Sequence, residues 1–176
     1  MKNIRSFENY TPDIDATVFV DDSSVVTGNV VIGRDSSIWP CCSIRGDIHS
    51  IVIGERTNIQ DGSVLHVTHD SEYAPGGFKL TVGDDVTVGH SVVLHACTVE
   101  DRCLIGMGSV VLDGSVVQSG AMVGAGSLVP PKKVLEGGYM WLGSPVKRVR
   151  ELSDKEKAFL KYSAQQYVKL KDRHMA

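Results

Sequence analysis

The strongest constraint in this sequence is a six-residue spacing of aliphatic residues. The spaced positions are Val20, Val26, Ile32, Ile38 and Ile44, then Ile53, Ile59 and Leu65, then Val82, Val88 and Leu94, and finally Val99, Ile105, Val111, Val117, Val123 and Val129. An α-helix needs apolar residues at i, i+3, i+4 and i+7, and a simple strand needs alternation, so neither fits. A parallel β-helix does fit, because each hexapeptide forms a strand and a corner, with its aliphatic side chain stacked inside.

The expected organisation is all-β with a C-terminal helix, in a single domain that spans residues 1–176. We place the β-helix at about 18–130, ended by Pro130-Pro131, and a connecting segment at 131–152. Ser153-Asp-Lys-Glu156 forms a capping box that opens a helix through about residue 171, and its apolar stripe predicts packing along the β-helix. Residues 1–17 are expected to cap the open end of the stack. Glycines that follow many of the aliphatic residues are expected to relieve crowding at corners, where φ can be positive.

Composition excludes several classes of partner. A net charge of −3 gives no electrostatic case for nucleic acid or an anionic membrane. The N-terminal stretch has no apolar signal region, and no apolar run approaches the length of a membrane span.

The four cysteines, Cys41, Cys42, Cys97 and Cys103, form no C-x-x-C pair and are expected to be reduced and mostly buried. These features favour a cytoplasmic protein.

The six-residue spacing breaks at three places, and all three surround histidines. Three extra residues lie between Ile44 and Ile53, eleven lie between Leu65 and Val82, and one is missing between Leu94 and Val99. The longest break, with Pro75-Gly-Gly as turn material, predicts a loop that projects from one corner. Loops on rigid scaffolds commonly carry function, so we expect the functional site here.

With three hexapeptides in each coil, Leu94 stacks on Leu65, so His95 stacks on His66 at about 4.8 Å, close enough for both imidazoles to bind one cation. Arg45 follows Ile44 in the same column, one coil below. His90 belongs to a different face, in a column with Asp61. One chain is therefore not expected to bring all three histidines together, whereas a symmetric trimer would join the two faces across an interface.

At these residues the sequence resembles the γ-class carbonic anhydrase family, and more narrowly its bacterial YrdA-like branch. The resemblance covers essentially the whole chain. It is most specific at Ile44-Arg-Gly-Asp47, Thr57-Asn-Ile-Gln-Asp-Gly62, Leu65-His66, Val88-Gly-His90, Leu94-His95, Leu142-Gly-Ser-Pro-Val-Lys147 and Tyr162-Ser-Ala-Gln-Gln-Tyr-Val168. It implies a left-handed β-helix, a homotrimer, and a zinc ion, or iron instead, at each subunit interface. The implied activity is the reversible hydration of carbon dioxide to bicarbonate by metal-bound hydroxide.

The resemblance also implies a role for each matching position. The metal ligands fall at His66, His90 and His95. Arg45 and Asp47, or Arg45 and Asp61 across the interface, would fix the trimer. Gln60 would orient the attacking water, with Asn58 and Tyr167 lining the pocket.

The sequence departs from the family at two positions that carry proton-shuttling glutamates in full γ-class enzymes. These positions hold Ile48 and His69 here. His69 is a candidate proton relay, because an unperturbed imidazole titrates near pH 6.5, and the competing interpretation is an ordinary surface-loop histidine. Two other functions remain open: a metal-binding trimer without significant activity, and a hexapeptide acyltransferase. His49 and His174 receive no role.

Overall fold

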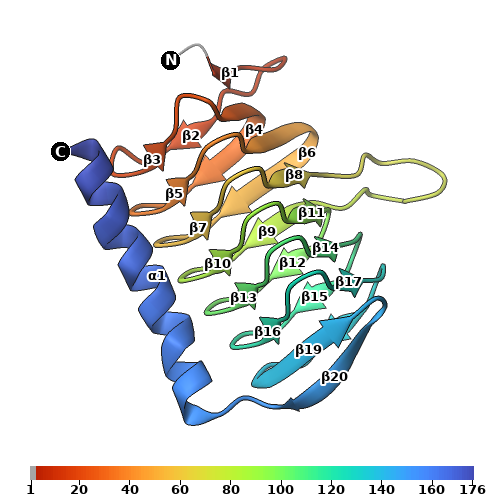
Figure 1. Ribbon diagram of the computed structural model, residues 1–176. Coiled ribbons are helices and arrows are strands. Elements are labelled where there is room, and N and C mark those ends of the chain that lie inside the picture. The colour runs from red at the N-terminus through yellow and green to blue at the C-terminus, as the bar shows by residue number, and fades with distance from the viewer. Residues whose placement is uncertain (1–2) are drawn as a thin grey trace.

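The computed structural model describes residues 3–176 and is a stack of short parallel strands wound into coils, with one helix along its side (Figure 1). Each coil contributes to three faces. The helix-covered face contains β3 (Phe19–Val20), β5 (Ser37–Ile38), β7 (Asn58–Ile59), β10 (Thr87–Val88), β13 (Leu104–Ile105), β16 (Met122–Val123), β19 (Tyr139–Gly143) and β20 (Val146–Glu151). The predicted fold class, an all-β hexapeptide β-helix with a C-terminal helix, is confirmed.

The other two faces share one sheet, because two long strands run around the corner between them. These strands are β4 (Val25–Ile32) and β6 (Ser43–Ile53). The β8 face continues with β8 (Val64–His66), β11 (Val93–His95), β14 (Val110–Val111) and β17 (Leu128–Val129). The β9 face continues with β9 (Leu80–Val82), β12 (Thr98–Val99), β15 (Val116–Val117) and β18 (Val134–Leu135).

The six-residue spacing identifies the core. Of the predicted inward-pointing residues, all are at most 1 % exposed except Val20, which is partly buried against the same cluster. Small residues that lie two positions before an inward-pointing aliphatic residue fill the corners. Their hydroxyl groups donate to backbone carbonyls, as Ser24 does to Trp39 and Ser36 to Gly54. Cys42, Cys97 and Cys103 occupy such corners and are buried free thiols, whereas Cys41 is exposed. Burial raises the pKa of all three buried thiols, that of Cys42 to about 11. These thiols therefore carry little of the reactive thiolate form near neutral pH.

The glycines after the aliphatic residues serve close packing rather than positive φ. At Gly106 an added Cβ would lie 2.4 Å from the backbone nitrogen of Ala125 in the next coil, and at Gly54 it would lie 2.3 Å from Asp84 Oδ1. Neither glycine is among the residues with positive φ. The crowding expected at these corners is therefore real, but its cause is the neighbouring coil and not a left-handed backbone.

The β-helix is longer than the predicted range of 18–130. At its start, β1 (Ile4–Arg5) and β2 (Asp13–Ile14) pair in parallel with β4, so this segment forms a partial coil that covers the open end. At its end, β18 pairs in parallel with β15, and β19 with β16, so Pro130-Pro131 does not end the repeat. The prolines lie in a corner, where no ladder N–H is needed. The final strand, β20, then pairs antiparallel with β19 and closes the stack.

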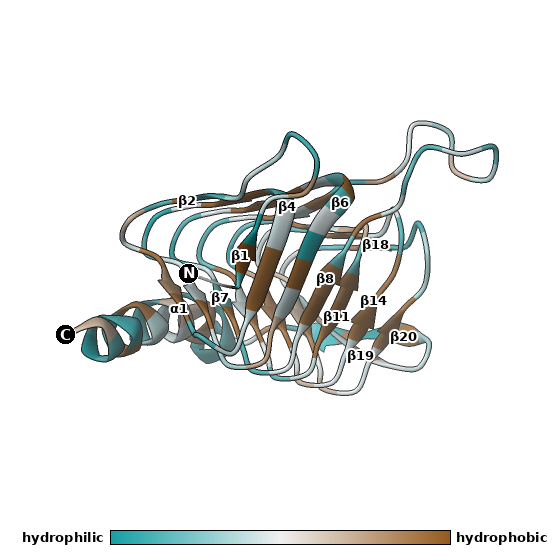
Figure 2. Cartoon of the chain, turned by 90° about the horizontal axis from the view of Figure 1, so that it is seen from above, coloured by the Kyte–Doolittle hydropathy of each residue, from teal (hydrophilic) through white to brown (hydrophobic). Residues whose placement is uncertain are grey.

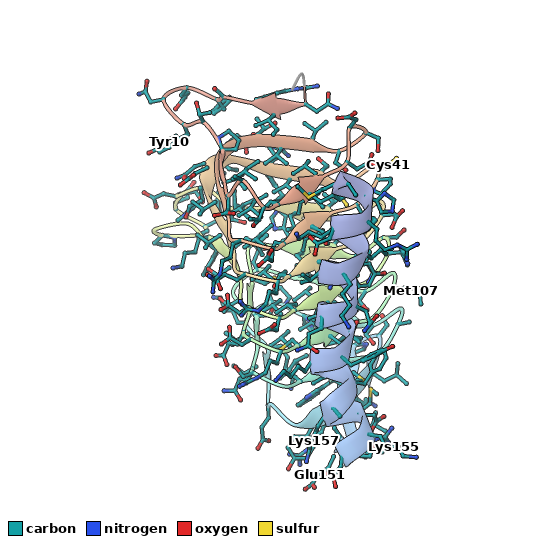
Figure 3. The ribbon with its side chains drawn as sticks, turned by 90° about the vertical axis from the view of Figure 1, so that its left-hand side faces the viewer. Tyr10, Cys41, Met107, Glu151, Lys155 and Lys157 are labelled. Carbon is teal, nitrogen blue, oxygen red and sulfur yellow. The ribbon has the colours of Figure 1, made fainter. Side chains whose placement is uncertain are left out.

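The C-terminal helix α1 (Asp154–Met175) begins at the predicted capping box and continues beyond the predicted residue 171. Ser153 accepts from the Glu156 backbone, and the Glu156 side chain accepts from the Ser153 backbone. Figures 1 and 3 show α1 running along the coils, and Figure 2 shows from above that it lies beside the stack. No helix within residues 3–176 has the length and apolar character needed to cross a membrane.

The eleven-residue insertion projects from the corner between β8 and β9, on the side away from α1 (Figures 1 and 2). Antiparallel bridges join Thr68 to Phe78 and Ser71 to Ala74, so the loop is a short hairpin. We refer to residues 68–78 as the corner hairpin. Tyr73 lies near its tip and is almost fully exposed.

Candidate metal centre

The two stacked histidines lie where the spacing predicts. His66 ends β8 and His95 ends β11, and the two residues are direct register partners. Leu65 and Leu94 point into the core just before them, so both imidazoles must point outward. His66 Nδ1 lies 3.3 Å from His95 Nε2, which makes these two nitrogens the centre of the candidate site.

A carboxylate anchors the other nitrogen of each of these two rings. His66 Nε2 lies 3.1 Å from Asp47 Oδ1, and His95 Nδ1 lies 2.6 Å from Asp113 Oδ1. Burial opposes ionisation of Asp113, but hydrogen bonds from Thr68 and His95 outweigh it and hold the pKa of Asp113 below its usual value. Burial likewise acts against Asp47, and the hydrogen bonds from Arg45 and His66 lower its pKa overall. Both carboxylates are therefore ionised near neutral pH and can only accept hydrogen bonds.

This arrangement determines which nitrogens are left to bind a cation. If the N–H groups point at Asp47 and Asp113, then His66 Nδ1 and His95 Nε2 face each other as two lone pairs. Two lone pairs at 3.3 Å repel unless a proton or a cation lies between them. Zinc binds imidazole nitrogen at about 2.0–2.1 Å in tetrahedral geometry, which places neighbouring ligand nitrogens roughly 3.3–3.4 Å apart. The donor pair therefore fits a zinc ion, and burial lowers the pKa of His66, which favours the neutral ring that metal binding requires.

The third predicted ligand lies at another corner of the coil. His90 follows β10, and its Nδ1 lies 2.9 Å from Asp61 Oδ2, so these two residues share a column as the sequence predicts. Both side chains are about half exposed. Within residues 3–176, no three His, Cys, Asp or Glu side chains come together as a metal-binding group. The structure thus brings His66 and His95 together and leaves His90 apart, at the opposite edge of the β8 face.

Arg45 lies in the column of the stacked histidines, as predicted, and its guanidinium contacts Asp47 Oδ2 in the same chain. Asp47 therefore accepts from Arg45 on one oxygen and from His66 on the other. The Arg45 side chain is 50 % exposed, whereas that of Asp47 is 16 % exposed. The Arg45 guanidinium therefore remains accessible at the surface, while the Asp47 carboxylate that it contacts is mostly buried.

The predicted polar shell lies behind the His90 corner. Gln60 is 6 % exposed, and its Nε2 donates to Asn58 Oδ1 at 3.0 Å. Asn58 in turn donates to Thr87, whose hydroxyl contacts Ser163 on α1. Asn58 is completely buried, so it does not line a pocket as expected but holds the amide of Gln60. The contact of Ser163 with this shell was not expected from sequence, although Ser163 lies in the Tyr162–Val168 segment that resembles the family.

Tyr167 lies on α1 and lines a cleft of about 300 Å³ between the helix and the helix-covered face. Gln60 and Met107 line the same cleft, and Met107 lies at the edge of the coils in Figure 3. Burial, with a smaller contribution from the charge of Asp61, raises the pKa of Tyr167 and keeps its hydroxyl protonated. Tyr167 and Gln60, predicted to surround one site, therefore do share one cleft.

His69, the candidate proton relay, is exposed at the base of the corner hairpin. It lines a pocket of about 500 Å³ together with Glu8, Tyr10, Asn29, Gly46, Asp47, Ile48, His49 and Ser50. His49, which received no role from sequence, therefore faces the same pocket, and its Nδ1 accepts from the Ser50 backbone. His174 packs against Phe19 and Trp39 and does not line this pocket.

Sequence reasoning missed Asp113 and Thr68. Asp113 follows Val111 by two residues, and Val111 stacks on Leu94, so the column arithmetic contained the signal. The contact between Thr68 and Asp113 joins positions 45 residues apart and depends on how the corner hairpin folds back.

The parallel coils define a hexapeptide-repeat protein with a pair of stacked histidines on its surface, and comparison with known proteins identifies the family. The chain is 59 % identical over 172 residues to protein YrdA of Escherichia coli, covering 98 % of this chain and 94 % of that protein. It is 43 % identical to a carbonic anhydrase of Geobacillus kaustophilus, covering 94 % and 87 %, and 46 % identical to the mitochondrial gamma carbonic anhydrase 1 of Arabidopsis thaliana, covering 94 % and 60 %. The chain belongs to the γ-class carbonic anhydrase family and is a YrdA-like member of it.

Solved structures agree on the fold. A Bacillus cereus protein proposed to be an acetyltransferase superposes with a TM-score of 0.91 at 37 % identity, covering 97 % of this chain and 95 % of that one. A hexapeptide transferase family protein from Anaplasma phagocytophilum superposes with a TM-score of 0.88 at 36 % identity, covering 98 % of both. No protein-family model matches the chain.

Proposed function

We propose that this protein is a metal-dependent carbonic anhydrase that reversibly hydrates carbon dioxide at a site shared between subunits of a homotrimer. The observation that carries the proposal is the pair of facing nitrogens on His66 and His95, 3.3 Å apart, with their outer nitrogens anchored by carboxylates. Metal-binding histidines commonly present one nitrogen to the ion and donate the other N–H to a carboxylate. All three proposed ligands follow this pattern, since His90 contacts Asp61.

The arrangement of the β8 face supports the trimer. His90 lies at one edge of this face, and His66 and His95 lie at the other. Between them runs an outward column without charge, formed by Val64, Val93, Val110 and Leu128. Packing three β8 faces around a threefold axis would bury this column and bring His90 of one protomer to His66 and His95 of the next. Each interface would then hold one ion between the three histidines.

Zinc is the ion we propose, with iron as the alternative. When bound, such an ion supplies Lewis-acid chemistry, and as in other carbonic anhydrases it lowers the pKa of water to about 7. The residues of this chain would provide the remaining requirements. Gln60 would hold the reacting water by its amide, which Asn58 orients, and Tyr167 would enclose the cleft beside it. Asp47, Asp61 and Asp113 would hold the three imidazoles in place.

Proton release is the step of the proposed reaction at which this chain departs from the family pattern. Ile48 and His69 occupy the two positions where full γ-class enzymes carry shuttling glutamates, and Ile48 cannot carry a proton. We assign the relay to His69, because it lines the open pocket that also contains Asp47. An imidazole can both accept and release a proton, which suits this task.

Two other functions compete with this proposal. A metal-binding trimer without appreciable hydration activity is favoured by Ile48 at a shuttle position. Acyl transfer is suggested by the names of the structural relatives, but it needs a single general-base histidine and a coenzyme A cleft. The three carboxylate-anchored histidines are unexplained by that chemistry, so it ranks last.

Metal content alone does not separate the first two functions, so hydration must be measured on fully metallated protein. The protein should be reconstituted with zinc, and separately with iron under anaerobic conditions, and its metal content measured by elemental analysis. Stopped-flow hydration of carbon dioxide is then compared with the His95→Ala variant. We expect about one ion per protomer and hydration above the variant and above buffer. Full metal occupancy with no hydration would assign the protein to the non-catalytic class.

A further inference from the structure

Asp113 makes a contact outside the metal site that the proposed function does not explain. Its two oxygens have different partners, since Oδ1 lies 2.6 Å from His95 Nδ1 and Oδ2 accepts from the Thr68 hydroxyl at 2.5 Å. The side chain of Asp113 is 30 % exposed, so solvent reaches it only partly. A carboxylate held on both oxygens has little freedom to rotate.

Thr68 belongs to a different structural unit. It is the first residue of the corner hairpin, and its backbone exchanges two hydrogen bonds with Phe78 at 2.9 and 3.0 Å. Phe78 in turn lies against Gly114, the residue after Asp113, within 3.4 Å of where a Cβ would be. The hairpin base therefore contacts the Asp113 corner through both a hydrogen bond and a ring.

We propose that Asp113 and Thr68 are positioning residues for the metal site, which hold His95 in the tautomer that presents Nε2 to the ion. Asp113 accepts the Nδ1 proton of His95, which leaves the Nε2 lone pair facing His66. Thr68 fixes the orientation of Asp113, so the corner hairpin supports the site through this contact. The inference rests on the proposed function only for the identity of the ion, because the tautomer is a property of the metal-free protein.

A set of matched variants separates this positioning role from a role in hairpin stability alone. Thr68→Val removes the hydroxyl that reaches Asp113, whereas Thr68→Ser keeps it. Ser71→Ala removes a hydroxyl from the same hairpin that contacts only the Ala74 backbone nitrogen. Asp113→Leu keeps the approximate size of the side chain but has no atom that can accept the His95 proton.

The first measurement determines the tautomer of His95 in the metal-free protein. Long-range proton–nitrogen NMR of the imidazoles in chelator-treated protein should show His95 protonated at Nδ1 in the parent, Thr68→Ser and Ser71→Ala. In Asp113→Leu this proton should move to Nε2 or exchange between both nitrogens. A His95 ring that stays Nδ1-protonated in Asp113→Leu would overturn the proposal, even if every variant binds metal.

The second measurement is zinc affinity by competition with a chromophoric chelator. Asp113→Leu should weaken zinc binding by about 10- to 100-fold, as expected when the partner of a ligating histidine is lost. Thr68→Val should weaken it by roughly two- to tenfold, as for one lost hydrogen bond, while Thr68→Ser and Ser71→Ala match the parent. Equal affinities for Thr68→Val and Ser71→Ala would remove the hairpin from the proposal. A parent that binds no zinc would refute the proposed function and leave the tautomer result to decide the role of Asp113.

Discussion

Replacing Arg45 by alanine tests whether the candidate site is completed by a second protomer. In a single protomer, Arg45 is 50 % exposed and its contact with Asp47 resembles a surface ion pair. Such pairs contribute about 0–1 kcal/mol, so Arg45→Ala should barely change the unfolding free energy of an isolated chain. In the proposed trimer, Arg45 lies in the column that meets the neighbour and becomes buried with Asp47.

The expected cost in the trimer is much larger. Removing one partner of a buried ion pair costs about 3–5 kcal/mol, because the other charge is left uncompensated. His66 still contacts Asp47 Oδ1 after the substitution, so we expect the lower end, about 3 kcal/mol at each interface. At about 1.4 kcal/mol for each factor of ten, this weakens association by more than about 100-fold.

The assay is sedimentation equilibrium over a range of protein concentrations, with Arg34→Ala as the matched control. Arg34 is also an exposed arginine, 60 % accessible, and it contacts Glu55 at 3.0 Å at a different corner. We expect Arg34→Ala to remain trimeric and Arg45→Ala to dissociate within the accessible range. If both variants associate as the parent does, the reasoning about the β8 face is wrong. A monomeric parent that binds zinc fully would exclude the shared site altogether.

Three further predictions concern the chemistry and the helix. His69→Ala should slow hydration in weak buffer with unchanged zinc content, and added imidazole should restore the rate; a parental rate in every buffer would exclude His69 as the relay. His66→Ala should lose zinc and activity together, without rescue by imidazole, and zinc retained at parental affinity would contradict its role as a ligand. Hydrogen bonds from Arg150 and Ser153 lower the pKa of Glu156 to about 2, from an ordinary value near 4.5. The stability that ionised Glu156 contributes is therefore full above about pH 4.5 and is lost as the pH falls toward 2, so the difference in denaturation midpoint between Glu156→Gln and the parent should vanish over that range.

Much of the candidate site could be placed from sequence, because a β-helix converts linear spacing into position. Once Leu65 and Leu94 are stacked, His66 and His95 must be neighbours, and His90 must lie on another face with Asp61. The prediction failed at Pro130, where the two prolines were expected to end the repeat. Leu135 and Trp141 keep the six-residue spacing, and β18 and β19 continue the coils, because prolines are tolerated at a corner.

The contacts that refine the site were beyond the spacing pattern. The sequence indicated that Asn58 would line a pocket, but the packing of α1 buries it beneath Gln60. The pairing of Thr68 with Asp113 depends on the path of the corner hairpin, and the shared pocket of His49 and His69 depends on the extra residues in β6. Insertions have no repeat to fix their register, so their side chains could not be positioned in advance.

The sequence by itself determined the β-helix, its core residues, the start of α1 and the column of each proposed ligand, because a six-residue repeat leaves one way to bury the aliphatic side chains. Only the tertiary structure decided which imidazole nitrogens face each other, which carboxylates hold the rings, and how the corner hairpin reaches Asp113 through Thr68. These are questions of side-chain orientation and loop path. Hydrogen bonds between residues remote in the chain determine both, and no periodicity encodes them.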